Sequence, residues 1–313
     1  LIISGEADGY FHANGLDLES LAGQGPVIPG VYDFDLDDLP YPAWDLVLEL
    51  YQPKLAFVAK GTTLPIQATR GCPYSCFHYC TYPAQQGRKV RQRSPAKVIE
   101  EMRHWQDMLG VTSFIFRDPV FSLNRKHTEQ LCDALEAIGA PFTFGVETHL
   151  KNLEAGLGER LYNVGLRLVY VGIESVTPEV IADAHRATIP IDQQSERITA
   201  LEALGIKVKT MFIFGFPKDD FASIRRSIEY ALKLRTSYAQ FSVFTPYPGT
   251  PVFREYASKI ATPQFEDFTQ WNLVFDHPIL KPKDIRSLLN QAYRRYYTNP
   301  PWLLKTALAS LKA

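Results

Sequence analysis

Three of the four cysteines in the chain lie within nine residues, in the stretch GCPYSCFHYC. They are Cys72, Cys76 and Cys80. Three thiolates on one short loop suit an iron–sulfur cluster. A cubane of four iron atoms takes four ligands, so three protein thiolates would leave one iron open to a small molecule. The spacing therefore favours a 4Fe-4S cluster on this loop.

Two other interpretations of the cysteines stay open. Zinc would take a fourth ligand, and His78 lies between two of the cysteines. However, the spacing Cys-x3-Cys-x-His-x-Cys is too crowded to close a good tetrahedron. The thiols could also be unliganded. The chain would then be a degenerate, non-catalytic scaffold that only binds a partner.

Composition excludes several classes of protein. The 313 residues carry 33 basic and 34 acidic side chains, so global charge argues for neither nucleic acid nor an acidic membrane as a partner. The longest apolar runs are far shorter than a membrane span. Four cysteines do not make a disulfide framework, and no signal peptide opens the chain. We expect a cytoplasmic protein.

The elements that must position the cysteine loop follow a repeating pattern from Leu64 onward. Short apolar runs rich in β-branched and aromatic residues alternate with amphipathic helical stretches. We expect strands at LPIQATR, SFIFRD, FTFGVE, LVYVGIES, KTMFIFG and AQFSVFT. In the first helix after the loop, Ser94 can cap and Pro95 can take the first helical position. Runs that are apolar on both faces predict a parallel sheet covered by helices.

Six βα units suit an open partial barrel, so the predicted fold class is α/β. In such folds the site lies at the carboxyl ends of the strands. The chain places polar residues there, beside the cysteine loop: Asp118, Glu147, Glu174 and Thr245.

The stretch TRGCPYSCFHYC resembles the cluster loop of the radical S-adenosylmethionine (SAM) enzymes. Five further stretches resemble their cobalamin-binding branch, in the same order: RKVRQRSPAKVIEEM, FIFRDPVFSLNRK, YVGIES, MFIFGFPKD and FSVFTPYPGT. The resemblance covers about residues 1–255. It implies a partial (β/α)6 TIM-barrel-like fold, a 4Fe-4S cluster held by the three cysteines, and S-adenosylmethionine bound at the open iron.

The implied chemistry is reductive cleavage of S-adenosylmethionine to methionine and a deoxyadenosyl radical, with an electron from a reductant such as flavodoxin or ferredoxin. With cobalamin, the radical enzyme would be a methyltransferase that methylates a carbon of a small-molecule or lipid-like substrate. A radical cyclase, oxidase or rearrangement enzyme on the same scaffold is the alternative. Catalytic residues that act on the substrate are not identified by the resemblance.

The cysteine loop departs from the family in one respect. The family spacing is Cys-x3-Cys-x2-Cys, whereas this chain has Cys-x3-Cys-x3-Cys. The aromatic residue before the last cysteine is kept as Tyr79, so the extra residue is Phe77 or His78. We expect the loop to absorb it as a bulge.

By the same resemblance, three carboxylates are expected to contact S-adenosylmethionine. Asp118, followed by Pro119, would meet its amino end, Glu174 would meet the ribose hydroxyls, and Glu147 is a further candidate. The structural alternatives are a helix-capping Asp118 and a buried, hydrogen-bonded Glu174 with Ser175 as a helix cap. His149 stands where Arg would be expected.

The fifth and sixth strands would supply the adenine contacts. Gly215 and Pro217 would let backbone groups approach the ring, with Phe214 or Phe216 as its wall, although both could be core aromatics. The backbone from Thr245 to Tyr247 would add contacts.

Two other groups of residues favour structural roles. The basic run GRKVRQR, with Arg88, Lys89, Arg91 and Arg93, favours a solvated or interdomain role over contact with an anionic ligand or nucleic acid. Cys132 shares a helical face with apolar residues and is expected to be a core thiol.

The resemblance divides the chain into four parts. Residues 1–30, with SGEADGYF, resemble the end of a cobalamin-binding domain, residues 31–60 form a linker, 61–255 the radical SAM core and 256–313 a helical extension. The cobalamin-ligating Asp-x-His-x-x-Gly motif is absent from the sequence, so the chain is expected to begin inside a longer protein. The apolar stripe of residues 299–313 predicts a docked helix, or else a peripheral membrane anchor.

Overall fold

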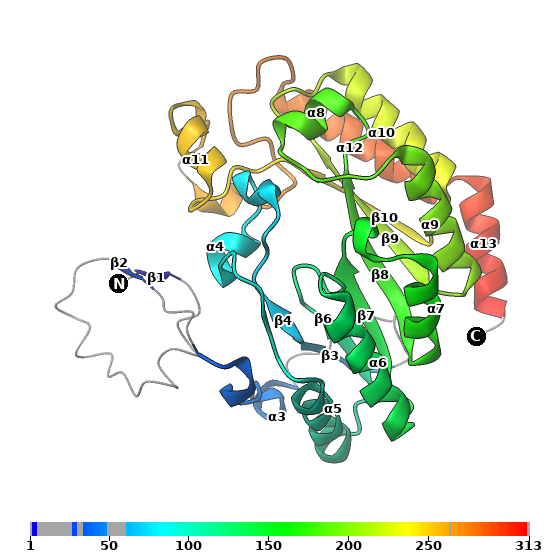
Figure 1. The fold of residues 1–313 in the computed structure, drawn as a ribbon. Helices are drawn as coiled ribbons and strands as arrows, with labels where there is room; N and C mark the ends of the chain where they lie inside the picture. The colour runs from blue at the N-terminus through cyan, green and yellow to red at the C-terminus, as the bar shows by residue number, and fades with distance from the viewer. Residues whose placement is uncertain (1, 5–26, 30–33, 49–60, 263, 312–313) are drawn as a thin grey trace. The chain divides into compact units, whose positions relative to one another are not determined.

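The computed structural model describes residues 2–4, 27–29, 34–48, 61–262 and 264–311 (Figure 1). Strands β1 (Ile2–Ser4) and β2 (Val27–Pro29) pair in parallel. Most of the expected cobalamin-domain remnant at residues 1–30 lies outside the described residues, and so do parts of the expected linker. The four-part division of the chain therefore stays a prediction.

The predicted strands are all present in one six-stranded sheet, in the order β10-β9-β8-β7-β6-β3. The pairs β3–β6, β6–β7, β8–β9 and β9–β10 are parallel. The six strands are β3 (Thr63–Ile66), β6 (Ser113–Phe116), β7 (Thr143–Thr148), β8 (Leu166–Glu174), β9 (Lys207–Phe214) and β10 (Tyr238–Val243). This confirms the α/β class and the parallel sheet of a partial (β/α)6 barrel.

The chain folds as two compact units. The first comprises residues 1–74, 81–148 and 163–167. Besides β3, β6 and β7, it holds η1 (Leu36–Asp38), α3 (Trp44–Val47), β4 (Thr69–Arg70), α4 (Tyr82–Gln86), β5 (Arg91–Gln92), α5 (Pro95–Leu109) and α6 (Arg125–Ile138). As predicted, Ser94 caps α5 and Pro95 begins it. Helices α5 and α6 lie side by side (Figure 1), and Cys132 on α6 is fully buried, which confirms it as a core thiol.

The second unit comprises residues 75–80, 149–162 and 168–313. Besides β8 to β10, it holds η2 (Ser75–His78), η3 (Leu150–Asn152), α7 (Ala155–Asn163, whose last residue belongs to the first unit), α8 (Pro178–Asp183), α9 (Ile191–Ala203), α10 (Phe221–Leu234), α11 (Pro251–Tyr256), η4 (Ala257–Lys259), η5 (Phe265–Asp267), α12 (Pro282–Tyr297) and α13 (Pro300–Leu311). The C-terminal region is helical and aromatic, as predicted.

Tyrosines of α12 cover the free edge of β10. The Tyr293 hydroxyl accepts a hydrogen bond from the Phe241 amide and donates one to the Phe241 carbonyl. The Tyr297 hydroxyl makes the same two hydrogen bonds with Ala239. An edge strand otherwise presents unpaired backbone groups, so the C-terminal extension closes this side of the sheet.

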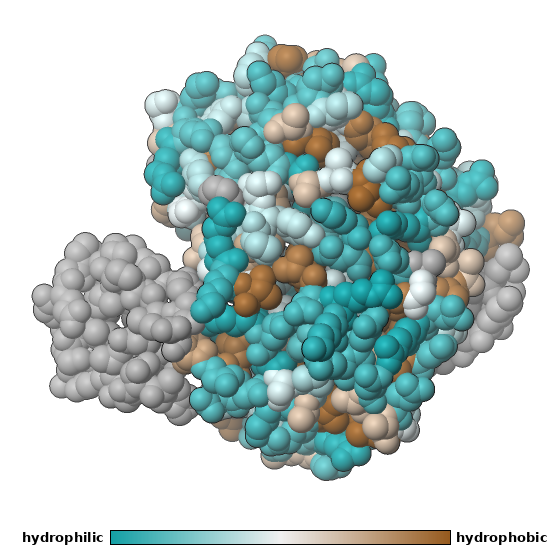
Figure 2. All heavy atoms as spheres, viewed as in Figure 1, coloured by the Kyte–Doolittle hydropathy of each residue, from teal (hydrophilic) through white to brown (hydrophobic). Residues whose placement is uncertain are grey.

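None of the described helices reaches the length and hydrophobicity that crossing a bilayer requires. The face in Figure 2 is largely hydrophilic, with hydrophobic side chains in scattered patches.

Candidate cofactor site

The segment between the second and third cysteines of the loop forms a tight turn. Residues Ser75–His78 form the 3-10 helix η2, and the amides of Tyr79 and Cys80 both donate to the Cys76 carbonyl, at 3.1 and 2.9 Å. His78, at the end of this turn, lies 3.4 Å from the Glu255 carboxylate through Nε2. A 3-10 turn is compact, and absorption of the extra residue without loss of cluster binding stays a prediction.

Cys76 and Cys80 form a thiol pair whose charged form is stabilised. A hydrogen bond with Cys80 is the main cause that lowers the pKa of Cys76 to about 6, against the effect of burial and with help from the Arg186 guanidinium. The thiolate is the form that ligates metals. The donor set of this turn therefore fits an iron-ligating site.

Arg186, which the sequence did not predict, is the charge that organises this region. Its buried guanidinium donates to the Gly172 carbonyl at 2.8 Å, lies 3.3 Å from Glu174 Oε1 and 3.9 Å from Cys76 Sγ. Burial disfavours the cation, but Glu174, Tyr79 and Cys76 raise the pKa of Arg186 overall. The only sequence signal was a single basic residue soon after α8.

Glu174 ends β8 in a left-handed conformation, with φ of 64°, after a bulge in the strand. Its side chain is buried and committed to Arg186. Gly172 makes this arrangement possible, because a Cβ there would collide with the Glu174 carboxylate and the Arg186 guanidinium. The alternative in which Ser175 caps the next helix is wrong. Thr177 is the cap residue of α8, and the Ser175 hydroxyl instead accepts from the Thr177 amide.

Asp118 follows β6 and is fully buried. Its carboxylate accepts hydrogen bonds from the consecutive amides of Ala68 and Thr69, directly before the cysteine loop. Burial raises the pKa of Asp118 to about 6, although these hydrogen bonds oppose the rise. Asp118 is not a helix cap, because Asn124 caps α6.

The start of the cysteine loop is packed against the basic run. Gly71 has φ of 92°, and a Cβ there would collide with the Lys89 carbonyl oxygen. The Cys72 amide donates to the Gly87 carbonyl at 3.1 Å. Only glycine fits this conformation and this close approach.

The basic run therefore does not have the expected solvated or interdomain role throughout. Arg88 donates to the Pro73 carbonyl and Arg91 to the Gln86 carbonyl, each at 3.0 Å. Arg93 is buried and pairs with Glu101. Strand β5 within the run pairs with β4 in antiparallel fashion. These arginines brace the backbone around the cysteine loop.

Glu147 lies in β7, in the first unit. Its Oε2 accepts from the Tyr82 hydroxyl at 3.1 Å and lies 3.9 Å from Arg117 Nη1. His149 caps η3 in the second unit, with Nε2 2.8 Å from the Ala187 carbonyl oxygen. Burial, assisted by Arg186, lowers the pKa of His149 to about 4, so its imidazole is neutral near pH 7.

An aromatic cavity of about 200 Å³ lies in the second unit. Tyr79, Phe216 and Phe244 line it, with ring centroids 5.4 Å apart for Tyr79–Phe216 and 4.8 Å for Phe216–Phe244. Phe214 instead packs against Phe241 in the sheet core. Of the two phenylalanines considered for the adenine wall, Phe216 is the one that faces a cavity.

The remaining predicted contacts lie around this part of the second unit. Gly215 has φ of 82°, and its amide donates to Asp219 Oδ2 at 3.0 Å. The Thr245 hydroxyl donates to the Val243 carbonyl, and the Tyr247 hydroxyl to the Phe268 carbonyl. Backbone contacts from Gly215 and from Thr245 to Tyr247 stay predictions.

Cys72 belongs to the first unit, and Cys76 and Cys80 to the second. Within the described part of the chain, no group of three or more His, Cys, Asp or Glu residues stands ready to hold a metal ion. Ligation of one cluster by all three cysteines therefore stays a prediction.

Comparison with known proteins gives one family match. The model of the radical SAM superfamily matches residues 66–231. An uncharacterized methyltransferase of Pyrococcus horikoshii is 28% identical over 275 residues, which are 87% of this chain and 58% of the relative. The bacteriochlorophyllide d C-12(1)-methyltransferase of Chlorobaculum tepidum is 26% identical over 215 residues, 68% of this chain and 47% of the relative.

A solved structure shares the fold. The radical S-adenosylmethionine methyltransferase TsrM from Kitasatospora setae, determined with cobalamin and a [4Fe-4S] cluster bound, matches with a TM-score of 0.57 at 22% identity. The match covers 63% of this chain and 37% of TsrM. The chain spans about half the length of the curated relatives described here.

Proposed function

The chain belongs to the radical SAM superfamily, and from this premise we propose that it is the catalytic core of a cobalamin-dependent radical methyltransferase. The observation that carries the proposal is the thiol pair of Cys76 and Cys80 beside the buried Arg186, in which Cys76 is held toward its thiolate form. The methyltransferase names of the relatives and the cobalamin bound to TsrM support methyl transfer.

We assign the cluster to Cys72, Cys76 and Cys80. When bound, a 4Fe-4S cluster supplies the electron that cleaves S-adenosylmethionine to methionine and a deoxyadenosyl radical, after reduction by a flavodoxin- or ferredoxin-class protein. Arg186 offsets the negative charge of the thiolates. Asp118 fixes the backbone before Cys72 through the amides that it binds.

The aromatic cavity is our candidate for the adenine site. Tyr79, Phe216 and Phe244 provide flat aromatic surfaces for a ring, and the backbone at Gly215 stays our candidate for a further contact. His78, Asp183, His185 and Glu255 line the same cavity, so a bound ring would meet polar groups as well as aromatic side chains. Glu147 and Glu174 stay our candidates for the polar parts of S-adenosylmethionine, with Thr245 and Tyr247 as backbone contacts.

Substrate, reductant and location belong to the proposal as well. We propose a small-molecule or lipid-like substrate and a cytoplasmic enzyme that associates with a membrane only at its periphery. Cobalamin belongs to the proposal as a cofactor, although its usual ligating motif is absent from the sequence.

Iron binding tests the proposal first. After anaerobic reconstitution we expect roughly four irons per chain, and loss of all of them in Cys72→Ala, Cys76→Ala or Cys80→Ala. Cys132→Ala is the matched control, because Cys132 is buried in α6 and is not part of the cysteine loop. Stoichiometric zinc without iron uptake would sink the proposal.

Product analysis then separates methyl transfer from the alternatives. With dithionite, cobalamin and methyl-labelled S-adenosylmethionine, we expect deoxyadenosine and methionine from one molecule, and S-adenosylhomocysteine and a labelled methyl group on the substrate from a second. Deoxyadenosine without methyl transfer would instead support a cyclase, oxidase or rearrangement enzyme.

A further inference from the structure

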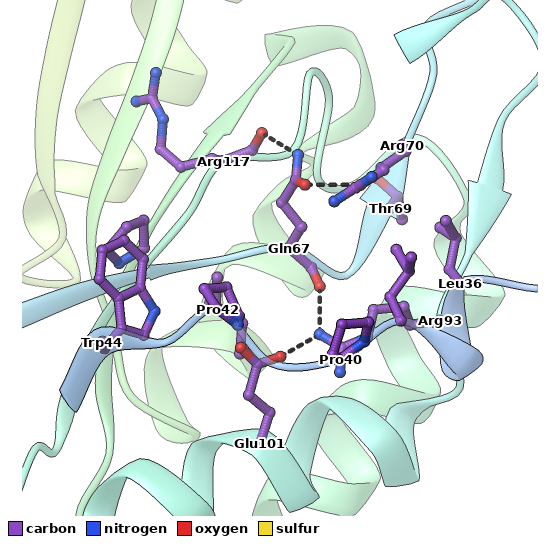
Figure 3. Close-up of a pocket in the computed structure, with 13 residues that line it drawn as sticks. Leu36, Pro40, Pro42, Trp44, Gln67, Thr69, Arg70, Arg93, Glu101 and Arg117 are labelled. Carbon is purple, nitrogen blue, oxygen red and sulfur yellow. Dashed lines mark hydrogen bonds and ion pairs between the residues drawn. The ribbon is translucent and has the colours of Figure 1, made fainter. Parts of the chain in front are cut away.

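A cavity of about 340 Å³ lies in the first unit beside β3, the end strand of the sheet (Figure 3). One wall is apolar and carries Pro40, Pro42 and Trp44 from the segment before β3, and Pro65 comes from the strand itself. The other wall is polar and lies at the carboxyl ends of β3 and β6. In α/β folds this is the side on which ligands bind.

The prolines explain why this cavity is not closed by backbone pairing. A segment beside an edge strand can add to the sheet through its N–H groups. Pro40, Pro42 and Pro65 have no N–H to donate, so a regular ladder between the two segments is disfavoured. The sequence thereby keeps a gap of ligand size next to β3.

Gln67 orders the polar wall. Its Nε2 donates to the Arg117 carbonyl at 3.2 Å, and its Oε1 accepts from Arg70 Nε at 2.9 Å (Figure 3). Gln67 thus joins the Arg70 side chain to the Arg117 backbone, whereas the Arg117 side chain extends away from Gln67 (Figure 3). The Arg117 side chain is half exposed and lies only at the limit of an ion pair with Glu147, at 3.9 Å, a contact that contributes little.

Arg93 lines the same cavity. Its Nη1 donates to the Gln67 carbonyl at 3.1 Å and to the Glu101 carboxylate. Its Nε is buried and has no hydrogen-bond partner among the residues that the structure describes. A buried donor without an acceptor costs about 1–3 kcal/mol, and an anionic oxygen would satisfy it. The lining holds three arginines against the single carboxylate of Glu101.

We propose that this cavity binds an organic anion. Its apolar body lies against Trp44 and the prolines, and its carboxylate or phosphate accepts hydrogen bonds from the guanidinium groups. If the proposed function holds, this anion is the recognition end of the substrate, because Thr69 of the lining stands three residues before Cys72.

Calorimetric titration of the full chain as purified tests binding, with three probes that share one ring body. They are 2-naphthoate, 2-naphthyl phosphate and the neutral 2-naphthylmethanol. We expect at least one anion to bind about tenfold more tightly than the alcohol, and the tighter anion identifies the headgroup. In Arg117→Gln and Arg70→Gln the anion should lose about tenfold in affinity, with the alcohol unchanged. Arg103→Gln, an exposed arginine of α5, is the matched control.

Equal binding of the three probes would overturn the proposal, and so would anion affinity that Arg117→Gln and Arg70→Gln leave unchanged. Trp44→Ala should weaken all three probes alike, which separates the apolar wall from the charged wall. The assay needs no cluster. A negative result here therefore leaves the proposed radical function standing, and failed iron uptake leaves the anion site standing.

Discussion

Each of the two units buries one aspartate just beyond the carboxyl end of a strand. Asp118 follows β6 in the first unit, and Asp219 follows β9 in the second. Both are almost completely buried, and each accepts hydrogen bonds from two consecutive backbone amides. Burial raises the pKa of each to about 6.

The two aspartates differ in how far they reach along the chain. Asp118 binds amides 49 and 50 residues away, at the end of β3. Asp219 binds amides three and four residues away and also accepts from the Ser223 hydroxyl at 2.5 Å. A buried carboxylate that binds two amides thus joins distant segments at Asp118, before the cysteine loop, and stabilises a local turn at Asp219. Removal of the carboxylate should therefore lower the unfolding free energy more at Asp118, because no local turn holds the two segments together there.

Asp118→Ala should have the largest effect. It leaves two buried amides without their acceptor, and an unpaired buried amide costs about 2 kcal/mol, so we expect roughly 4 kcal/mol less unfolding free energy. Urea unfolding measures this. Iron uptake after reconstitution should fall too, because the backbone before Cys72 loses its anchor.

Asp107→Ala, at an exposed position of α5, is the control and should change unfolding by less than about 0.5 kcal/mol. Normal stability and iron content in Asp118→Ala would show that the tie to β3 is dispensable.

The pH dependence of stability should reflect both aspartates. Their pKa rises from 3.8 to about 6 on folding, so the folded state holds these protons more tightly than the unfolded state. The contribution of these two groups to the unfolding free energy should be full below pH 4 and fall as pH rises through 6, by roughly 3 kcal/mol per group. Urea titrations between pH 4 and 8 measure the slope.

Asp118→Asn and Asp219→Asn should each remove about half of this slope. If both variants keep the slope of the unchanged chain, the pH dependence arises from other groups.

Asp219→Ala also frees two amides, but both lie in the same local turn, which can shift to expose them to water, so we expect a smaller cost of roughly 2 kcal/mol. The turn keeps the bond from the Asp219 amide to the Phe216 carbonyl, and Asp220 still caps α10 with Ser223. Urea unfolding at pH 5 makes the comparison, with Ser223→Ala as the second variant. A loss equal to that of Asp118→Ala would contradict the idea that local geometry compensates.

Local signals explain what could be predicted from the sequence. The six strands follow apolar runs, α5 begins at Ser94 and Pro95 as expected, and Cys132 was placed in the core by its helical neighbours. Each of these depends on residues within one element. The cysteine loop was singled out by the spacing of its cysteines and Asp118 by its place at a strand end, and their roles as cofactor contacts stay predictions.

The contacts that organise the site could not be predicted, because they join distant or unremarkable residues. Arg186 meets Cys76 across 110 residues, and no short pattern indicates that pair. In GFPKDD, the sequence does not tell that Asp220 caps a helix while Asp219 binds Gly215. Likewise, Phe214 and Phe216 differ by two positions, yet one packs in the sheet and the other faces a cavity.

The smallest expected effect concerns a second long-range tie, which lies near the surface of the second unit. Lys305 on α13 donates to Glu202 at 2.9 Å across 103 residues and to the Arg235 carbonyl at 3.0 Å. Its side chain is 40% exposed, so solvent screens the contact, and Lys305→Met should cost only about 1 kcal/mol. The Lys305 contacts join residues farther apart in the sequence than the Asp118 contacts do, but they are less buried. A smaller loss for Lys305→Met would show that burial, not sequence separation, determines how much each contact adds to the unfolding free energy.

The same helix decides between docking and membrane anchoring. Trp302 donates to the Ser237 carbonyl at 2.9 Å, whereas Leu304 is 63% exposed. We expect Leu304→Ser to leave both urea unfolding and sedimentation with phosphatidylglycerol vesicles unchanged, because α13 is a docked helix. If Leu304→Ser abolished vesicle binding while Lys305→Met left unfolding unchanged, α13 would be a membrane anchor. The substrate would then be sought in the lipid phase.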